Sequence, residues 1–309
     1  MYDCIIVGGG IAGLQAAIQL GRYRHKVLVI DKQKGRSALC GSYHNLLGWP
    51  EGVSGPELRE RGRRHAERLG VEFLEDEVIA AAKSDDQFQV ALAGDGGSFK
   101  SQTLLIATGV MDRFPPLPGL EERLGESIYI CPDCDGYEVM DRRAVVMGAG
   151  EAGSGMAMAI SYWTDRIIYV NHDRSAVSTS KREALEARGI EYIEEEIEEV
   201  LGGEDKSFCG VRLKDGRVIE GERAFIAFGG NRVITDWAMP LGIERLENKH
   251  IVTDPRTKMT GVPGVWAAGD VGIHAEQTSI AMGEGALAAI WIHKELVKRL
   301  RQKTVEHSG

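Results

Sequence analysis

The sequence predicts an α/β protein made of two three-layer units, and three observations lead to this prediction. The length of 309 residues suits two domains of about 150 residues each. A short apolar strand followed by a glycine-rich turn and a helix occurs near the N-terminus and again near residue 144. Glycine makes up 39 of the 309 residues, nearly twice the usual share of about 7%. This excess indicates many positions where the backbone turns tightly or approaches another group closely.

The first copy of the pattern begins with an apolar strand over 4–7 and continues through Gly8, Gly10 and Gly13 into a helix over 14–20. A second strand is expected over 26–30 and ends at Asp31. In a dinucleotide-binding (Rossmann-like) unit, such glycines let the chain approach a pyrophosphate, whose charge the helix N-terminus stabilises. An acid about 20 residues on binds the ribose hydroxyls, and Asp31 is the candidate for this contact.

The second copy has a strand over 144–147, the glycines Gly148, Gly150 and Gly153, a helix to about residue 163 and a strand over 166–170. Asn171 follows Gly148 by the same 23 residues that separate Asp31 from Gly8. Two such units predict two bound nucleotides, or one bound and one vestigial.

Three further segments complete the predicted order of elements. A buried strand over 103–106 leads into the turn Ala107-Thr108-Gly109, and the proline-rich residues 114–119 form a stiff linker. The segment 264–270 ends at Asp270 and precedes a long helix from Gln277 to about residue 300. An amphipathic helix over 57–69 is interpreted as structural.

Composition excludes several classes of function. The net charge is −9, so the basic footprint of a nucleic-acid-binding protein is missing and no nucleic-acid partner is expected. No run of 18 apolar residues occurs, which predicts no transmembrane helix, and the first residues leave no room for a signal peptide. Five cysteines in a chain of this length do not form a secreted disulfide framework. A cytoplasmic enzyme is therefore expected.

The pair Cys131-Pro132-Asp133-Cys134 carries the most chemical information. Two cysteines at this spacing close a small disulfide or supply half of a zinc site. A zinc site needs two more ligands, yet the sequence has no second CxxC and no paired histidines, so no metal is expected. A redox disulfide can take two electrons from a flavin and pass them to a substrate disulfide. Asp135 follows the pair directly and is a candidate acid for the accompanying proton.

In these motifs and their order, the chain resembles the low-molecular-weight thioredoxin reductases, flavoproteins of the pyridine-nucleotide disulfide oxidoreductase class. The resemblance covers nearly the whole chain, and the cysteine pair precedes the second glycine motif as in that family. It implies one Rossmann-like domain inserted into another, with an FAD-binding domain at 1–114 and 243–309. The inserted NAD(P)H-binding-like domain, at 115–242, carries the cysteine pair and would swing relative to the FAD domain. A homodimer acting on thioredoxin or a similar small disulfide protein is implied as well.

The resemblance also implies roles for single residues. Cys134 would face the flavin, Cys131 would attack the substrate disulfide and Asp135 would be the acid. Gly148, Gly150 and Gly153 would bind NAD(P)H. The residues implied to bind FAD are Gly8, Gly10, Gly13, Asp31, Asn45, Thr108, Gly109, Asp270, Gln277 and Thr278.

The first departure from the family pattern concerns the electron donor. The family's run of arginines for the 2′-phosphate of NADPH is replaced by Asn171-His172-Asp173-Arg174. Arg174, Lys181 or Arg182 are candidates to compensate, and NADH or reduced ferredoxin become alternative donors.

The other departures concern the flavin loop and the cysteine motif. The run 35–40 replaces the family's Gly-Gly-Gln, and its Cys40 is interpreted as a core residue in preference to a flavin contact. The cysteine motif is closer to a divergent branch that includes gliotoxin-type dithiol oxidases and pyridine-nucleotide-independent thioredoxin reductases. An FAD-dependent dithiol oxidase using oxygen is the alternative function, although Asp135, in place of the oxidases' histidine, favours a reductase. His44, His172 and His274 are interpreted as structural.

Overall fold

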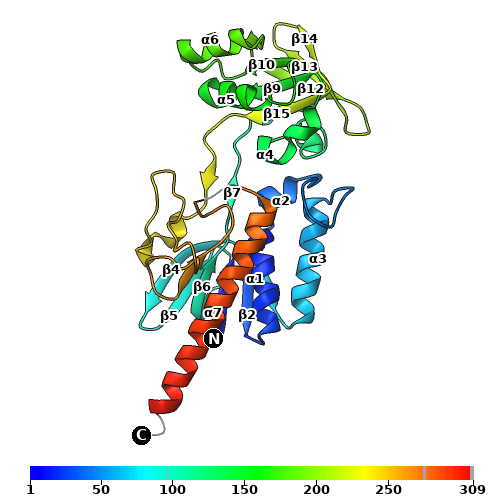
Figure 1. Cartoon of the computed structure of the whole chain (residues 1–309). Helices are drawn as coiled ribbons and strands as arrows, with labels where there is room; N and C mark the ends of the chain where they lie inside the picture. Colours follow the sequence, from blue (N-terminus) through cyan, green and yellow to red (C-terminus); the bar gives the residue numbers. More distant parts are fainter. Residues whose placement is uncertain (95, 274–275, 307–309) are drawn as a thin grey trace. The chain divides into compact units, whose positions relative to one another are not determined.

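The computed structural model describes residues 1–94, 96–273 and 276–306 and divides the chain into two compact units. Unit 1 consists of 1–38, 56–111 and 232–309, and unit 2 consists of 39–55 and 112–231. The chain thus leaves unit 1 and returns to it, as the colours along the sequence in Figure 1 show. The predicted fold class, with one Rossmann-like domain inserted into another, is confirmed.

Unit 1 is built on a seven-stranded sheet with the order β3-β2-β1-β6-β5-β4, in which β17 also pairs with β6. The pairs among β1, β2, β3, β6 and β17 are parallel, whereas β4, β5 and β6 form an antiparallel meander. The strands are β1 (Tyr2–Val7), β2 (Val27–Ile30), β3 (Glu72–Leu74), β4 (Val78–Ser84), β5 (Gln87–Leu92), β6 (Ser98–Ile106) and β17 (Val265–Ala267).

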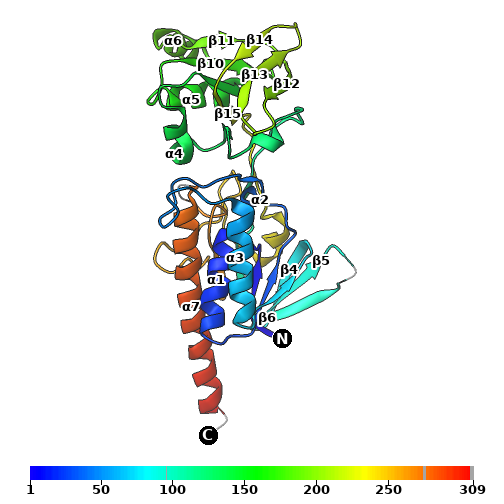
Figure 2. The ribbon, with the colours of Figure 1, turned by 90° about the vertical axis from the view of Figure 1, so that its right-hand side faces the viewer.

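Helices α1 (Ile11–Arg22), α3 (Gly55–Arg68) and α7 (Thr278–Glu306) lie together in unit 1, with the short α2 (Arg36–Leu39) above them (Figure 2). Small residues of α1 and α7, among them Ala16 and Ala288, are fully buried with Ile6 of β1, so the two helices pack closely on the sheet. The other face of the sheet is covered by Trp237 and Leu241 of the 3₁₀ helix η3 (Asp236–Leu241). None of the described helices is both long and apolar enough to cross a membrane.

Unit 2 has three layers. Its central parallel sheet has the order β11-β10-β9-β15-β8, a three-stranded antiparallel sheet β12-β13-β14 covers one face, and α5 and α6 cover the other. The strands are β8 (Ile128–Tyr129), β9 (Ala144–Gly148), β10 (Ile167–Asn171), β11 (Glu191–Ile193), β12 (Ile197–Gly202), β13 (Phe208–Leu213), β14 (Val218–Glu220) and β15 (Arg223–Ala227). The helices are α4 (Pro132–Asp135), α5 (Gly150–Ile160), α6 (Thr179–Ala187), η1 (Glu121–Arg123) and η2 (Gly136–Val139).

The boundaries between the two units lie earlier in the sequence than predicted. β7 (Val110–Met111) pairs antiparallel with β16 (Arg232–Val233), and this pairing places both segments in unit 1. The changes therefore fall at 111/112 and 231/232, where the sequence predicts 114/115 and 242/243. The segment 39–55 also groups with unit 2, because its backbone bonds to the turn before β8: the N–H of Gly41 donates to the carbonyl of Leu124 at 3.1 Å.

Candidate functional site

The first glycine turn joins β1 to α1 by a close approach that only glycine allows. Gly8 has φ +106°, and a Cβ there would lie 2.3 Å from the carbonyl oxygen of Ala107. A Cβ on Gly13 would lie 1.9 Å from the carbonyl oxygen of Gly8. A Cβ on Gly10, by contrast, would meet only the Ser37 hydroxyl at 3.9 Å. The inner side of the turn is therefore tightly packed, while the N-terminus of α1 has space beside it.

Asp31 follows β2 directly, as predicted, but it already has a partner. Its Oδ2 accepts a hydrogen bond from Nη2 of Arg59 at 2.7 Å, and the same guanidinium donates to Oε1 of Gln33 at 2.9 Å. Arg59 comes from α3 and is largely buried. The carboxylate of Asp31 is thus held in one orientation at the end of the strand, and Arg59 is a residue that sequence spacing did not reveal.

The other predicted cofactor residues of unit 1 lie at the carboxyl ends of its strands. Thr108 and Gly109 follow β6, and the Thr108 hydroxyl donates to the carbonyl of Ile234 at 2.9 Å. Asp270 follows β17 and forms an ion pair with Arg36 at 3.2 Å. Gln277 precedes α7, and Thr278 is its first residue. Because carboxyl ends of parallel strands share one edge of a sheet, these residues follow the same edge as the first glycine turn.

In unit 2, Cys131 and Cys134 form a disulfide at the start of α4, just after β8. Cys131 is the N-cap residue, and its Sγ accepts a hydrogen bond from the backbone N–H of Cys134 at 3.1 Å. The N–H of Asp135 donates to the carbonyl of Cys131 at 3.0 Å. The three predicted catalytic residues therefore belong to one short turn. Among the described residues, no three His, Cys, Asp or Glu side chains are grouped as metal ligands.

The carboxyl group of Asp135 lies close to a histidine that the sequence analysis interpreted as structural. Nδ1 of His44 lies 3.9 Å from Oδ1 of Asp135 and 3.9 Å from Oε1 of Glu138. Burial raises the pKa of Asp135, and His44 partly counteracts this effect. The pKa of His44 is raised, mainly by Asp135. No motif or spacing signals this contact, because the two residues come from distant parts of the chain.

Cys40 belongs to the same neighbourhood but is not a nucleophile. Its Sγ donates to the carbonyl of Ser42 at 3.3 Å, and burial raises its thiol pKa to about 12. The side chain is only partly buried, which corrects the interpretation of Cys40 as a core residue. Cys4 is fully buried in β1, and Cys209 is exposed.

The second glycine turn also joins a strand to a helix, but its positive φ falls at Gly150 and not at Gly148, the position equivalent to Gly8. A Cβ on Gly148 would lie 2.6 Å from the carbonyl oxygen of Ala227, and a Cβ on Gly153 would enter the ring of Tyr169. Gly150 has φ +46°, and its N–H donates to Oδ1 of Asn171 at 2.9 Å. The N–H of Gly150 at the start of α5 could bind a phosphate, but it is already hydrogen-bonded to Asn171.

Asn171 is fully buried and hydrogen-bonded at both ends of its amide. Besides accepting from Gly150, it donates through Nδ2 to the carbonyl of Ser175 at 2.7 Å and to the hydroxyl of Tyr192 at 2.8 Å. His172 accepts from the N–H of Ile197 through Nδ1 at 2.8 Å. His274 lies outside the described residues.

The basic residues that could replace the missing arginine run all have acidic partners. Arg174 pairs with Glu195, Arg182 with Glu194 at 3.0 Å and Lys181 with Glu151 at 2.8 Å. In addition, the carboxylate of Asp173 pairs with Arg113 at 3.1 Å. The acidic run 194–196 thus supplies two of these partners, Glu194 and Glu195.

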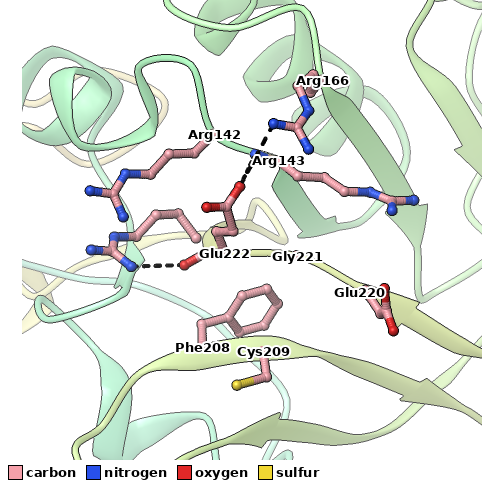
Figure 3. A pocket seen from close by; sticks show the side chains of 9 residues that line it. Arg142, Arg143, Arg166, Phe208, Cys209, Glu220, Gly221 and Glu222 are labelled. Atoms are coloured by element: carbon pink, nitrogen blue, oxygen red, sulfur yellow. Dashed lines mark hydrogen bonds and ion pairs between the residues drawn. The ribbon is translucent and has the colours of Figure 1, made fainter.

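A separate cavity of about 560 Å³ lies at the opposite edge of the central sheet of unit 2 (Figure 3). Arg143 immediately precedes β9, and Arg166 immediately precedes β10. The carboxylate of Glu222 lies between them and accepts from the N–H of Arg143 at 2.9 Å, with Arg166 at 4.0 Å. The charge inside the cavity is therefore partly neutralised by the protein itself, and the cavity is not part of the disulfide site.

Fold and site together define a disulfide oxidoreductase with two dinucleotide-binding folds. The pattern of the family "Pyridine nucleotide-disulphide oxidoreductase" matches residues 2–285, so the chain belongs to this family. Thioredoxin reductase of Aquifex aeolicus is 32% identical over 314 residues (96% of this chain, 94% of that protein). Thioredoxin reductase of Treponema pallidum is 32% identical over 300 residues (93% and 95%). The crystal structure of thioredoxin reductase from Streptococcus pyogenes has a TM-score of 0.85 and 26% identity, and covers 96% of this chain and 99% of its own. Within the family, the chain is a flavin-dependent disulfide oxidoreductase of the thioredoxin reductase type.

Proposed function

We propose that this protein is an FAD-dependent disulfide reductase that passes electrons through Cys131 and Cys134 to thioredoxin or a similar small disulfide protein. The observation that carries the proposal is the disulfide at the start of α4 with the carboxyl group of Asp135 in the same turn. Thioredoxin reductases are among its most similar relatives over nearly full length, which supports thioredoxin as the substrate.

Unit 1 fits FAD. The turn of Gly8, Gly10 and Gly13 leaves space beside the N-terminus of α1, and a helix N-terminus of this kind stabilises a pyrophosphate. Asp31, held by Arg59, would bind the ribose hydroxyls. The remaining predicted FAD residues of this unit are Thr108, Gly109, Asp270, Gln277 and Thr278, all near carboxyl ends of strands. Asn45 lies on the segment 39–55, and its FAD contact stays a prediction.

When bound, FAD supplies a carrier that accepts two electrons and passes them to the disulfide. The chain's own residues then perform the exchange. The Cys131 thiolate attacks one sulfur of the substrate disulfide, breaking that bond and releasing one substrate thiolate. Cys134 then attacks the Cys131 sulfur, which restores the enzyme disulfide and releases the second thiolate. Asp135 takes up the proton from the Cys134 thiol and returns it to one departing thiolate, and the other thiolate takes its proton from solvent, so the substrate gains two electrons and two protons in all.

The electron donor in this proposal is not NADPH. The Gly150 N–H bonds Asn171, and the Glu151 carboxylate at the start of α5 would repel a pyrophosphate. Asp173 would repel a 2′-phosphate. Arg174, Lys181 and Arg182 would each have to leave an acidic partner in order to bind one. Gly148, Gly150 and Gly153 accordingly serve the packing of the unit, and electrons reach the flavin from another donor.

The first experiment is anaerobic mixing of the purified yellow protein with NADPH, NADH or reduced ferredoxin while flavin absorbance is followed. Bleaching by reduced ferredoxin is expected, with NADPH and NADH each at least tenfold slower, because both nucleotides carry the pyrophosphate that the second turn does not suit. Rapid bleaching by NADPH would overturn the proposed donor assignment and leave the disulfide chemistry intact. Oxygen consumption with a small dithiol, in place of thioredoxin reduction, would favour the dithiol oxidase.

The homodimer and the cytoplasmic location stay predictions, and size-exclusion chromatography tests the homodimer.

A further inference from the structure

We propose that His44 is a positioning residue for Asp135, and that the two side chains together hold the proton exchanged with the Cys131–Cys134 pair. The inference rests on the proposed disulfide exchange and adds a residue that neither the sequence motifs nor the comparisons assign. It follows from the way the segment 39–55 is attached to unit 2, and from the charges that surround the imidazole.

The segment that carries His44 is attached to the rest of unit 2 just before the histidine, and it pairs with itself around the histidine. Besides the bond from Gly41 to Leu124, the backbones of Tyr43 and Val53 exchange hydrogen bonds at 2.8 and 3.3 Å. A Cβ on Gly125 would lie 2.3 Å from the nitrogen of Gly41, so the two backbones are in direct contact. His44 is therefore presented to Asp135 by a fixed backbone, and its side chain is one-third exposed.

Carboxylates surround the imidazole. Asp135 at the end of α4 and Glu138 in η2 each lie 3.9 Å from Nδ1, and Glu126, in the turn before β8, adds a third negative charge. The Cys40 thiol, which faces Asp135 and Glu126, stays neutral because its pKa is about 12. A separation of 3.9 Å suits an ion pair, or a proton passed through one water molecule. His44 can therefore pass a proton between Asp135 and solvent without a further base.

The two groups influence each other in opposite directions. His44 lowers the pKa that burial raises at Asp135, and Asp135 raises the pKa of His44. Because the sites interact, their protons come off in steps that belong to the pair. Removing His44 leaves Asp135 with burial and Glu138, both of which favour its protonated form. The carboxylate that accepts the Cys134 proton would then exist only at higher pH.

The test measures thiol–disulfide exchange without any electron donor. The flavin-containing protein, carrying Cys209→Ser to remove the exposed thiol, is reduced with dithiothreitol, desalted and mixed anaerobically with 5,5′-dithiobis(2-nitrobenzoate) between pH 5 and 9. Release of the coloured thiolate gives the exchange rate. His44→Gln is compared with its parent, and the ratio of the two rates at each pH cancels the cysteine ionisation common to both.

His44→Gln is expected to be about 3- to 10-fold slower than its parent near pH 6 and equal to it above about pH 8.5. The reason is that the carboxylate fraction of an acid falls about tenfold for each pH unit below its pKa. His44→Lys should recover most of the loss, since a fixed cation also favours the carboxylate. His65→Gln, on the exposed face of α3, should match the parent throughout.

A rate ratio that is constant with pH, or a lysine variant as slow as the glutamine variant, would overturn the role of His44. Failure of the proposed function has a different signature. In that case Cys131→Ser in the same background would release as much coloured thiolate as the parent, because the pair would not be the reacting group.

Discussion

The two glycine turns of this protein each join a strand to a helix, but they differ in backbone conformation and in surroundings. In unit 1, Gly10 at the start of α1 faces open space, and Asp31 is held at the end of the second strand by Arg59. In unit 2, the N–H of Gly150 is bonded to Asn171, which occupies the place equivalent to Asp31. The side-chain amide of Asn171 forms hydrogen bonds to three groups. These are the N–H of Gly150 in the turn, the carbonyl of Ser175 in the loop after β10 and the hydroxyl of Tyr192 in β11.

This difference shows that a glycine motif reports a strand–turn–helix connection and not an occupied site. The close approaches at Gly13 and Gly153 exist in both units, because they serve the packing of a helix against a strand. Ligand binding depends on whether the N–H groups of the turn, and the side chain that follows the second strand, can form hydrogen bonds to a ligand. The second unit uses the Gly150 N–H internally, and in the proposed reaction it contributes the disulfide at α4.

The strongest test of this division is Cys131→Ser. Turnover with thioredoxin should fall by about 1,000-fold or more, in keeping with the loss of a nucleophile. Flavin content and flavin reduction by the electron donor should stay unchanged, since both belong to unit 1. The measurement is thioredoxin reduction beside anaerobic flavin bleaching. A variant that keeps more than a tenth of the turnover would remove unit 2 from the reaction.

Asn171→Ala tests the structural use of the second turn. The substitution leaves the Gly150 N–H, the Ser175 carbonyl and the Tyr192 hydroxyl without their buried partner. We expect a loss of about 1–3 kcal/mol in unfolding free energy, measured by denaturant unfolding. Flavin reduction by the donor should be unaffected.

Asp31→Asn is the matched change in the first unit. Loss of the carboxylate that the ribose hydroxyls would contact should weaken FAD binding by about tenfold, or about 1.4 kcal/mol, measured by flavin release on dilution. Equal FAD content in this variant and the wild type would contradict the assignment of the first turn to FAD. A loss of FAD in Asn171→Ala would also contradict the contrast, because it would show that FAD binding depends on the second turn.

The smallest expected effect concerns Glu151 at the start of α5. Its carboxylate accepts from the Ser178 N–H and pairs with Lys181, and these contacts lower its pKa from 4.5 to about 2. A lowered pKa in the folded state stabilises the protein fully above about pH 4.5, and this contribution declines below that pH and is lost as the pH falls through about 2.

The exposed position of Glu151 and screening by salt keep this contribution small. Glu151→Gln should lower the midpoint of thermal unfolding by about 1 °C or less, with the same difference at pH 7 and pH 4.5. No difference at either pH would mean that the pKa of this carboxyl is not lowered in the folded protein. Lys181→Gln, which removes the partner side chain, should give a similar small decrease.

The sequence alone determined the features that depend on neighbours within one turn or one strand–turn–helix unit. Both glycine turns, their flanking strands and helices, the fold class and the cysteine pair with Asp135 were predicted from spacing, because a hydrogen-bonded turn joins residues three or four apart. The acid at Asp31 and the departure at Asn171 were also visible, since strand and helix lengths in such a unit vary little.

Only the tertiary structure decided which distant side chains meet. The partners of Asp31, Asp135 and Asp173 are Arg59, His44 and Arg113, and each pair joins separate elements of the chain. The change between units was misplaced for the same reason: β16 returns to pair with β7 over a long separation. Such contacts depend on strand order and on the course of the segment 39–55, and a single sequence carries no periodic signal for either. The chemistry of the cysteine pair was therefore readable from the sequence, whereas its electrostatic surroundings required the fold.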